Sequence, residues 1–135
     1  MRQGISFLLM APIALLLGCT SPDTDGDDSG APGARTPFER DLAPKLAECL
    51  GCHGGSEPDA GLDLSNVQAL AGIESGQLGM ALIEPGDHLQ SYLWHKVAGT
   101  QSIAGGMGRR MPVNHEWSDD DIDLLARWID LGAPP

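Results

Sequence analysis

A short run of cysteine and histidine has the types and spacing for cofactor chemistry: Cys49-Leu50-Gly51-Cys52-His53. The pattern C-x-x-C-H is the attachment signal for a c-type haem. Two thiols one helical turn apart can form thioethers with the two vinyl groups of one haem, and the adjacent imidazole is then held under the iron. We therefore predict one covalent haem c, attached through Cys49 and Cys52, with His53 as the fifth iron ligand.

Two other kinds of protein site also contain a C-x-x-C pair. A redox-active C-x-x-C pair is typical of a βαβ context, and the helical patterns of this chain do not provide one. A zinc site would need two further cysteine or histidine ligands at close spacing. The sequence favours haem over both.

Met111 is the predicted sixth ligand of the iron, with Met107 as the alternative. Met111-Pro112 lies 58 residues after His53, in a loop before the last helical pattern, and thioether ligation suits a high-potential electron carrier. Met107 stands between two glycines, where ordering the backbone costs most. Lesser candidates are Met80, His88, His95 and His115. We expect His95 to be solvated because it points away from the apolar face of its helix, and we expect His88 and His115 at the surface.

Three helical patterns separated by glycine-rich turns, without an alternating strand pattern, predict an all-α fold. The first pattern begins at Thr36-Pro37-Phe38-Glu39, which offers an N-cap, a proline at the first helical position and a capping-box glutamate. It runs toward Cys49. Pro44 lies inside it and must either kink the helix or restart it.

The second pattern follows residues 85–87 and is expected to end at Gly99. Its apolar face is predicted to consist of Leu89, Tyr92, Leu93 and Val97. The third pattern opens at Ser118, with Asp119, Asp120 and Asp121 in its first turn, and ends at Gly132. Its apolar face, which includes Leu131, is so wide that the helix should be wedged between two neighbours.

Two long stretches, 54–86 and 98–116, carry little predicted structure beyond a short possible helix at 65–71. Three helices and two long loops leave too little core made of side chains alone. A large apolar cofactor would supply the missing centre.

The N-terminal segment reads as an export signal. Residues 5–17 form a thirteen-residue apolar run behind a single positive charge, too short for a stable membrane span. The sequence Leu16-Leu17-Gly18-Cys19 resembles the lipobox of bacterial lipoproteins, and this resemblance implies lipidation of Cys19. Residues 20–36 are polar and acidic and are predicted to form a disordered tether. The predicted domains are therefore a signal peptide at 1–18, a lipidated tether at 19–36 and a folded domain at 37–135.

From Phe38 to Ala133 the chain resembles the class I c-type cytochromes, and among them the planctomycete-type cytochrome c domain. The resemblance rests on residues 49–54, Gly61-Leu62-Asp63-Leu64, residues 86–97, Met111-Pro112, Trp128-Ile129 and Gly132-Ala133. It implies Met111 as the distal ligand. It also implies that the first and last helices cross beside the haem, with Trp128 near their contact.

These observations predict a single-electron carrier with no substrate of its own, hence not an enzyme. It would face the periplasm on a lipid anchor, and Thr20 after Cys19 implies the outer membrane. The net charge of −11 disfavours binding to nucleic acid, and the net charge of −9 over residues 37–135 favours redox partner proteins with a basic docking face. The alternatives are a haem sensor or peroxide-type haem enzyme with a labile distal ligand, or a haem subunit of a larger oxidoreductase.

Overall fold

The structure is a computed structural model that describes residues 35–135. The predictions for Cys19 and for the signal peptide lie outside the described residues. Within residues 35–135 there are helices and loops but no strand, and two isolated bridges join Ala71 to Ile83 and Glu74 to Ala81. This confirms the all-α class. In the same part of the chain, every helix is too short or too polar to cross a bilayer.

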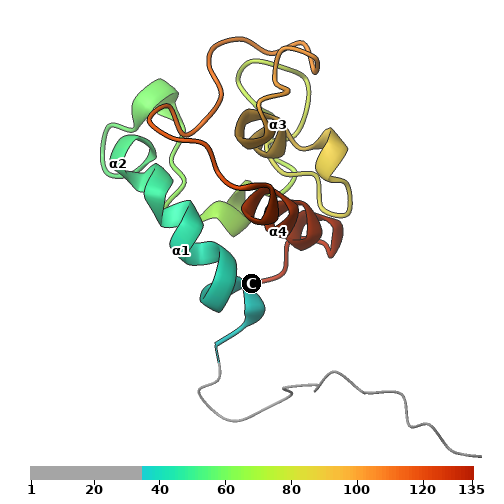
Figure 1. The fold of residues 1–135 in the computed structure, drawn as a ribbon. Helices are drawn as coiled ribbons and strands as arrows, with labels where there is room; N and C mark the ends of the chain where they lie inside the picture. The colour runs from blue at the N-terminus through green and yellow to red at the C-terminus, as the bar shows by residue number, and fades with distance from the viewer. Residues whose placement is uncertain (1–34) are drawn as a thin grey trace, which may run out of the picture. The chain divides into compact units, whose positions relative to one another are not determined.

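The first helical run is continuous from residue 38 to residue 53 (Figure 1). Its segments are the π-helix η1 (Phe38–Leu42), α1 (Ala43–Leu46), the 3₁₀-helix η2 (Ala47–Cys49) and α2 (Leu50–His53). The predicted capping box begins it. The Thr36 hydroxyl accepts the backbone N–H of Glu39 at 3.2 Å, and the Glu39 carboxylate accepts the backbone N–H of Thr36 at 2.9 Å.

Pro44 neither ends nor restarts this run. A proline has no N–H to donate, and its ring crowds the carbonyl four residues earlier in a standard α-turn. The turn before Pro44 is the wider π type, in which the N–H of Ala43 donates to the carbonyl of Phe38. The chain stays helical through Pro44 and continues to His53, four residues beyond the predicted end.

The long middle stretch contains only short helical turns. These are η3 (Asp59–Gly61) and η4 (Val67–Leu70), both of 3₁₀ type. The possible helix at 65–71 is therefore present only as one 3₁₀ turn. Leu64 and Val67 anchor this stretch because both are buried in the core.

The second predicted helix is split in two, into η5 (His88–Gln90) and α3 (Tyr92–Ala98). Ser91 between them is extended, and its hydroxyl accepts the backbone N–H of Glu84 at 2.8 Å. The split takes Leu89 off the apolar face and leaves it 54% exposed, so its predicted burial is wrong. Gly99 ends α3 in the left-handed conformation, as predicted.

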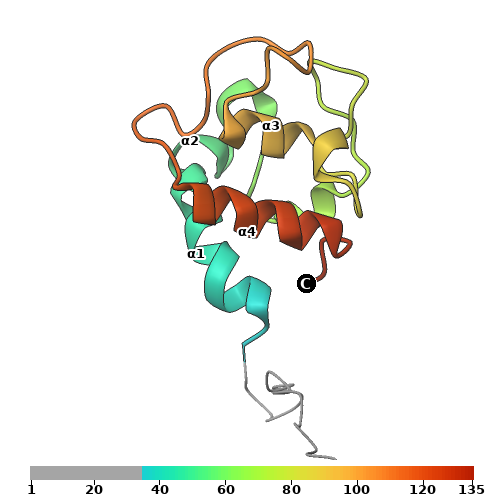
Figure 2. The ribbon, with the colours of Figure 1, turned by 45° about the vertical axis from the view of Figure 1, so that its right-hand side comes forward.

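The last helix, α4 (Asp119–Asp130), begins where predicted, because the Ser118 hydroxyl accepts the N–H of Asp121 at 3.2 Å. It packs against both η1 and α3, which confirms the predicted wedge (Figure 2). Leu131 lies just beyond its end and is exposed, so the prediction that Leu131 belongs to the apolar face is wrong.

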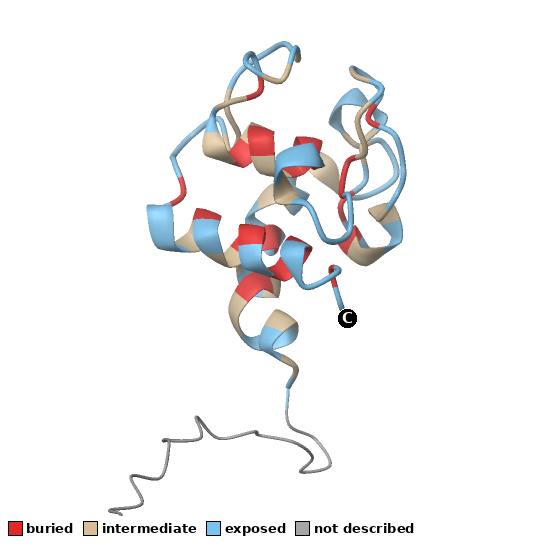
Figure 3. Ribbon diagram, turned by 90° about the vertical axis from the view of Figure 1, so that its right-hand side faces the viewer, coloured by how far each residue is buried: buried red, intermediate tan, exposed pale blue. Residues whose placement is uncertain are grey.

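One core joins these elements, and buried residues line both α3 and α4 (Figure 3). The rings of Phe38 and Trp128 lie 5.2 Å apart between centroids, where the first helical run meets α4. The expected position of Trp128 at this contact is confirmed. The buried core residues are Leu42, Leu46, Leu64, Val67, Ile83, Leu93, Val97, Trp117, Ile122, Leu125, Trp128, Ile129 and Ala133.

Candidate haem site

The C-x-x-C-H motif occupies the end of the first helical run. Cys49 is the last residue of η2, and Cys52 and His53 lie in α2. Neither cysteine forms a disulfide within residues 35–135. Cys49 is half-buried against the core, whereas Cys52 is exposed. Burial, reinforced by the negative charge of Glu48, raises the pKa of the Cys49 thiol to about 11, so this thiol is neutral at pH 7.

The backbone of His53 is fixed on both sides. Its carbonyl accepts the N–H of Leu64 at 2.7 Å, so the Gly61-Leu62-Asp63-Leu64 motif ties the middle stretch to the end of α2. Gly54 leaves the helix extended and close to Leu50. A Cβ on Gly54 would lie 2.8 Å from the Leu50 carbonyl oxygen, closer than real Cβ atoms come. These contacts set where the His53 side chain can point.

The His53 imidazole makes no hydrogen bond to any residue in 35–135, and its Nδ1 is buried. The indole Nε1 of Trp94 is likewise buried and unpaired within that range. Buried polar groups in folded proteins nearly always have a partner, so each exception indicates a missing group. An uncommitted imidazole beside two free thiols fits a covalent haem.

The other described histidines are engaged by protein groups. His95 is buried, with its Nδ1 2.7 Å from the Thr100 hydroxyl and its Nε2 2.9 Å from the Leu89 carbonyl oxygen. The expectation that His95 is solvated is therefore wrong. His88 Nδ1 lies 2.9 Å from the Asp130 carboxylate, and His115 Nε2 lies 2.9 Å from that of Glu48.

Met111 is half-buried and is held through its backbone to α3. Its N–H donates to the Lys96 carbonyl at 2.8 Å. The Lys96 ammonium donates to the carbonyls of Arg109 at 2.6 Å and Met107 at 3.3 Å. Arg110 Nε donates to the Val97 carbonyl at 2.8 Å. The segment before Met111 is thereby fastened along the last turns of α3.

The same segment is fastened a second time through Gln77. Its side-chain oxygen accepts the Tyr92 hydroxyl at 2.6 Å and the Met107 N–H at 3.3 Å. Gly106 lies so close to the Tyr92 ring that any Cβ would collide with it. Sequence reasoning gave no role to Gln77 or Lys96, because their partners lie 11–30 residues away with no local pattern to reveal them.

After Met111 the chain is tied to the haem-attachment helix. The Glu48 carboxylate accepts the Trp117 indole N–H at 3.1 Å and also contacts His115. Glu48 directly precedes Cys49. Met111 thus lies in the chain between an anchor on α3 and an anchor beside Cys49. Glu48 is a third residue whose role the sequence did not indicate.

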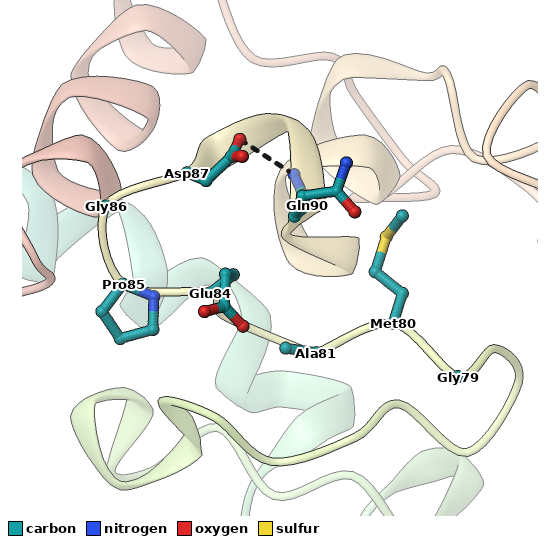
Figure 4. A pocket seen from close by; sticks show the side chains of 8 residues that line it. All are labelled: Gly79, Met80, Ala81, Glu84, Pro85, Gly86, Asp87 and Gln90. Atoms are coloured by element: carbon teal, nitrogen blue, oxygen red, sulfur yellow. Dashed lines mark hydrogen bonds between the residues drawn. The ribbon is translucent and has the colours of Figure 1, made fainter.

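The other two methionine candidates are placed differently. The side chain of Met107 is 73% exposed. Met80 lines an open pocket that includes none of the C-x-x-C-H residues (Figure 4). The residues around that pocket are Gly79, Met80, Ala81, Glu84, Pro85, Gly86, Asp87 and Gln90.

An all-α fold in which a helix ends in C-x-x-C-H, with a buried histidine nitrogen that has no protein partner within residues 35–135, is typical of the class of c-type cytochromes. Within that class, residues 49–107 match the family described as planctomycete cytochrome C, and this match supports a cytochrome c domain of that type. The match ends before Met111. No curated protein and no solved structure matches the chain. A cytochrome c domain indicates a haem-binding protein of electron transfer.

Proposed function

We propose that this chain is a single-electron carrier with one haem c, held by Cys49 and Cys52 and ligated by His53 and Met111. The haem supplies the Fe(III)/Fe(II) couple when it is bound. The chain supplies two thioether links, a fixed imidazole and a thioether sulfur. Filling both axial positions leaves no place for a substrate on the iron, which favours a carrier over an enzyme.

The observation that carries the proposal is the position of Met111. Its segment is fastened to α3 by Lys96 on one side and to Glu48, beside Cys49, on the other. A ligand held from both sides loses little entropy when it binds. Met107 is also held through its backbone, by Gln77 and Lys96, but the residue is 73% exposed, whereas Met111 is half-buried.

The proposal is tested on protein exported to an oxidising compartment with its haem attached. Mass spectrometry should show the mass of one haem, and acid acetone should not extract it. The oxidised protein should show the far-red Met–iron charge-transfer band, and the reduced protein should not bind carbon monoxide. Extractable haem would contradict the covalent link. Rapid carbon monoxide binding would favour the sensor or enzyme alternative.

We also propose a lipid tether at Cys19 that holds the domain on the periplasmic side of the outer membrane. The support is the lipobox-like sequence, the acidic stretch behind it and Thr20 in place of an acidic residue. Labelled palmitate should be incorporated by the wild type and not by Cys19→Ala, which should release soluble cytochrome. Absence of label from the wild type would contradict the anchor.

A further inference from the structure

Charge is distributed unevenly over the domain. Residues 88–115 contain three basic side chains, Lys96, Arg109 and Arg110, and no aspartate or glutamate. The remainder of 37–135 contains three basic and fifteen acidic residues, a net charge of −12. The positive segment comprises η5, α3 and the loop from Gly99 to Met111, which the hydrogen bonds of Lys96 hold against α3 (Figure 2).

Two of these positive charges are not neutralised by carboxylates. Arg110 Nη1 is paired with Glu116 at 2.8 Å. The Lys96 ammonium contacts carbonyl oxygens, and exposed Arg109 has no ion pair with any residue in 35–135. The neighbouring segment 72–83 contributes a single carboxylate, Glu74. Segment 88–115 itself therefore carries net positive charge in an otherwise acidic domain. Carboxylates contact its side chains at His88, Arg110 and His115, and none of these carboxylates is paired with Lys96 or Arg109.

The same loop exposes two large apolar side chains. Ile103 is 84% exposed and Met107 is 73% exposed. With Arg109 they form what we call the loop patch. Methionine and arginine are enriched at protein interfaces, and exposed apolar groups gain free energy when a partner covers them.

The loop patch is rigid enough to act as a preformed surface. Hydrogen bonds from Ile103 and Ala104 to the Thr100 carbonyl, at 3.0 and 3.2 Å, shape its turn. The Gln101 side chain donates to the Gly108 carbonyl at 3.1 Å and closes it. Preorganised loops lose less conformational entropy on binding than mobile ones.

We propose that the loop patch is the docking surface for a redox partner protein with an acidic face. The negative charge elsewhere on the domain would repel such a partner, and the positive patch would attract it, so the partner would arrive in one orientation. The patch ends two residues before Met111 in the sequence, so a partner docked there would lie close to the segment that contains the proposed iron ligand. This inference rests on the proposed electron-transfer function. The basic partner predicted from net charge would use the acidic faces instead.

The first test compares two charge reversals in the haem-loaded full chain. Arg109→Glu changes the patch. Arg127 is an exposed residue of α4, so Arg127→Glu makes the same change in net charge away from the patch and is the matched control. Stopped-flow oxidation of the reduced protein is measured with anionic hexacyanoferrate(III) and with cationic tris(phenanthroline)cobalt(III) at low ionic strength.

Arg109→Glu should slow the anionic oxidant by about threefold or more and accelerate the cationic one. Arg127→Glu should change both rates by less. Equal effects of the two variants would overturn the docking surface. Absorption spectra of each variant are recorded before the kinetics. If the haem spectrum is normal and both variants have equal kinetic effects, the docking surface is rejected but the electron-transfer function is not. A wild type without haem would overturn the proposed function and this inference with it.

The second test uses an acidic blue-copper protein as the protein probe. Titrated into isotope-labelled reduced cytochrome, it should shift amide resonances of residues 100–110 more than those of α4. Ile103→Ser should reduce the rate of electron transfer to the probe even at high salt, where charge is screened. Shifts centred on α4, or no effect of Ile103→Ser, would overturn the inference.

Discussion

At the scale of single residues, the competition between two methionines decides the chemistry of the iron. The backbone is anchored at both methionines, but Met111 is half-buried whereas Met107 is 73% exposed. We expect Met111→Ala to abolish the far-red charge-transfer band, lower the reduction potential and open the reduced iron to carbon monoxide. Met107→Ala should be nearly silent in all three measurements. The reverse pattern would assign the ligand role to Met107.

Lys96 is predicted to position Met111 without touching the haem. Its ammonium holds the carbonyls of Met107 and Arg109, and its own carbonyl holds the N–H of Met111. Lys96→Met keeps the length of the side chain but removes the donors, at a cost of about 1 kcal/mol per hydrogen bond because the freed carbonyls are exposed to water. We expect a weaker charge-transfer band and faster carbon monoxide binding, measured by flash photolysis.

Arg109→Gln is the control for Lys96→Met. It removes a positive charge from the same loop but no hydrogen bond of this clamp, because Arg109 takes part through its backbone carbonyl. Its band and carbon monoxide kinetics should match the wild type. If both variants behave alike, the loss of positive charge, and not the loss of the Lys96 hydrogen bonds, accounts for the change at Met111.

The role of a residue was predictable from the sequence where all of its partners lie within a few positions of it. The C-x-x-C-H run and the Thr36–Glu39 capping box are complete within a few residues, and the structure bears out the capping box. The burial of His95 was not predictable, because it depends on the Leu89 carbonyl freed when Ser91 interrupts the helix. A helical wheel assumes continuous helix and cannot show that interruption.

At the scale of elements, one ion pair connects the first helical run to α4. Lys45 Nζ lies 3.0 Å from the Asp121 carboxylate, which also accepts the Ser118 hydroxyl. The hydrogen bond from Ser118, followed by that from Lys45, lowers the pKa of Asp121 below its usual 3.8. A carboxyl with a lowered folded-state pKa stabilises the fold above the unfolded value, and this stability is lost as the pH falls through the folded pKa.

We therefore expect Asp121→Asn to lower the melting temperature by about 2–4 °C at neutral pH. The difference from the wild type should shrink as the pH falls below about 3.8, measured by thermal melts across pH. Asp123→Asn on the same helix has no such ion pair among residues 35–135 and serves as the control. A difference that persists unchanged at low pH would contradict the ionised carboxylate as its source.

Two element ends were predictable from the sequence. Ser118 begins α4, and Gly99 ends α3 because a left-handed residue is needed there. The π turn before Pro44 and the split at Ser91 were not predictable, since each depends on how the backbone satisfies its hydrogen bonds in three dimensions. Contacts such as Glu48 with Trp117, 69 residues apart, leave no trace in a local pattern.

At the scale of the whole molecule, the core is small for the length of loop it must hold. The two long stretches, 54–86 and 98–116, contribute few buried apolar side chains, namely Leu64, Val67, Leu82 and Ile83. A domain of this size with so little regular structure needs an additional source of buried apolar area. The proposed covalent haem would provide that area and would also link α2 to the segment that contains Met111.

We accordingly expect Cys49→Ala/Cys52→Ala, which cannot form the thioethers, to lose fixed tertiary structure. Trp117 and Trp128 are buried in the core, so their near-ultraviolet circular dichroism should vanish, while part of the far-ultraviolet helical signal remains. Amide exchange in α4 should accelerate by several orders of magnitude, because local protection is limited by global stability. Met107→Ala, which changes an exposed side chain, should keep both the dichroism and the protection. A doubly substituted chain that retained native tryptophan signals would show that side chains alone suffice to build this fold.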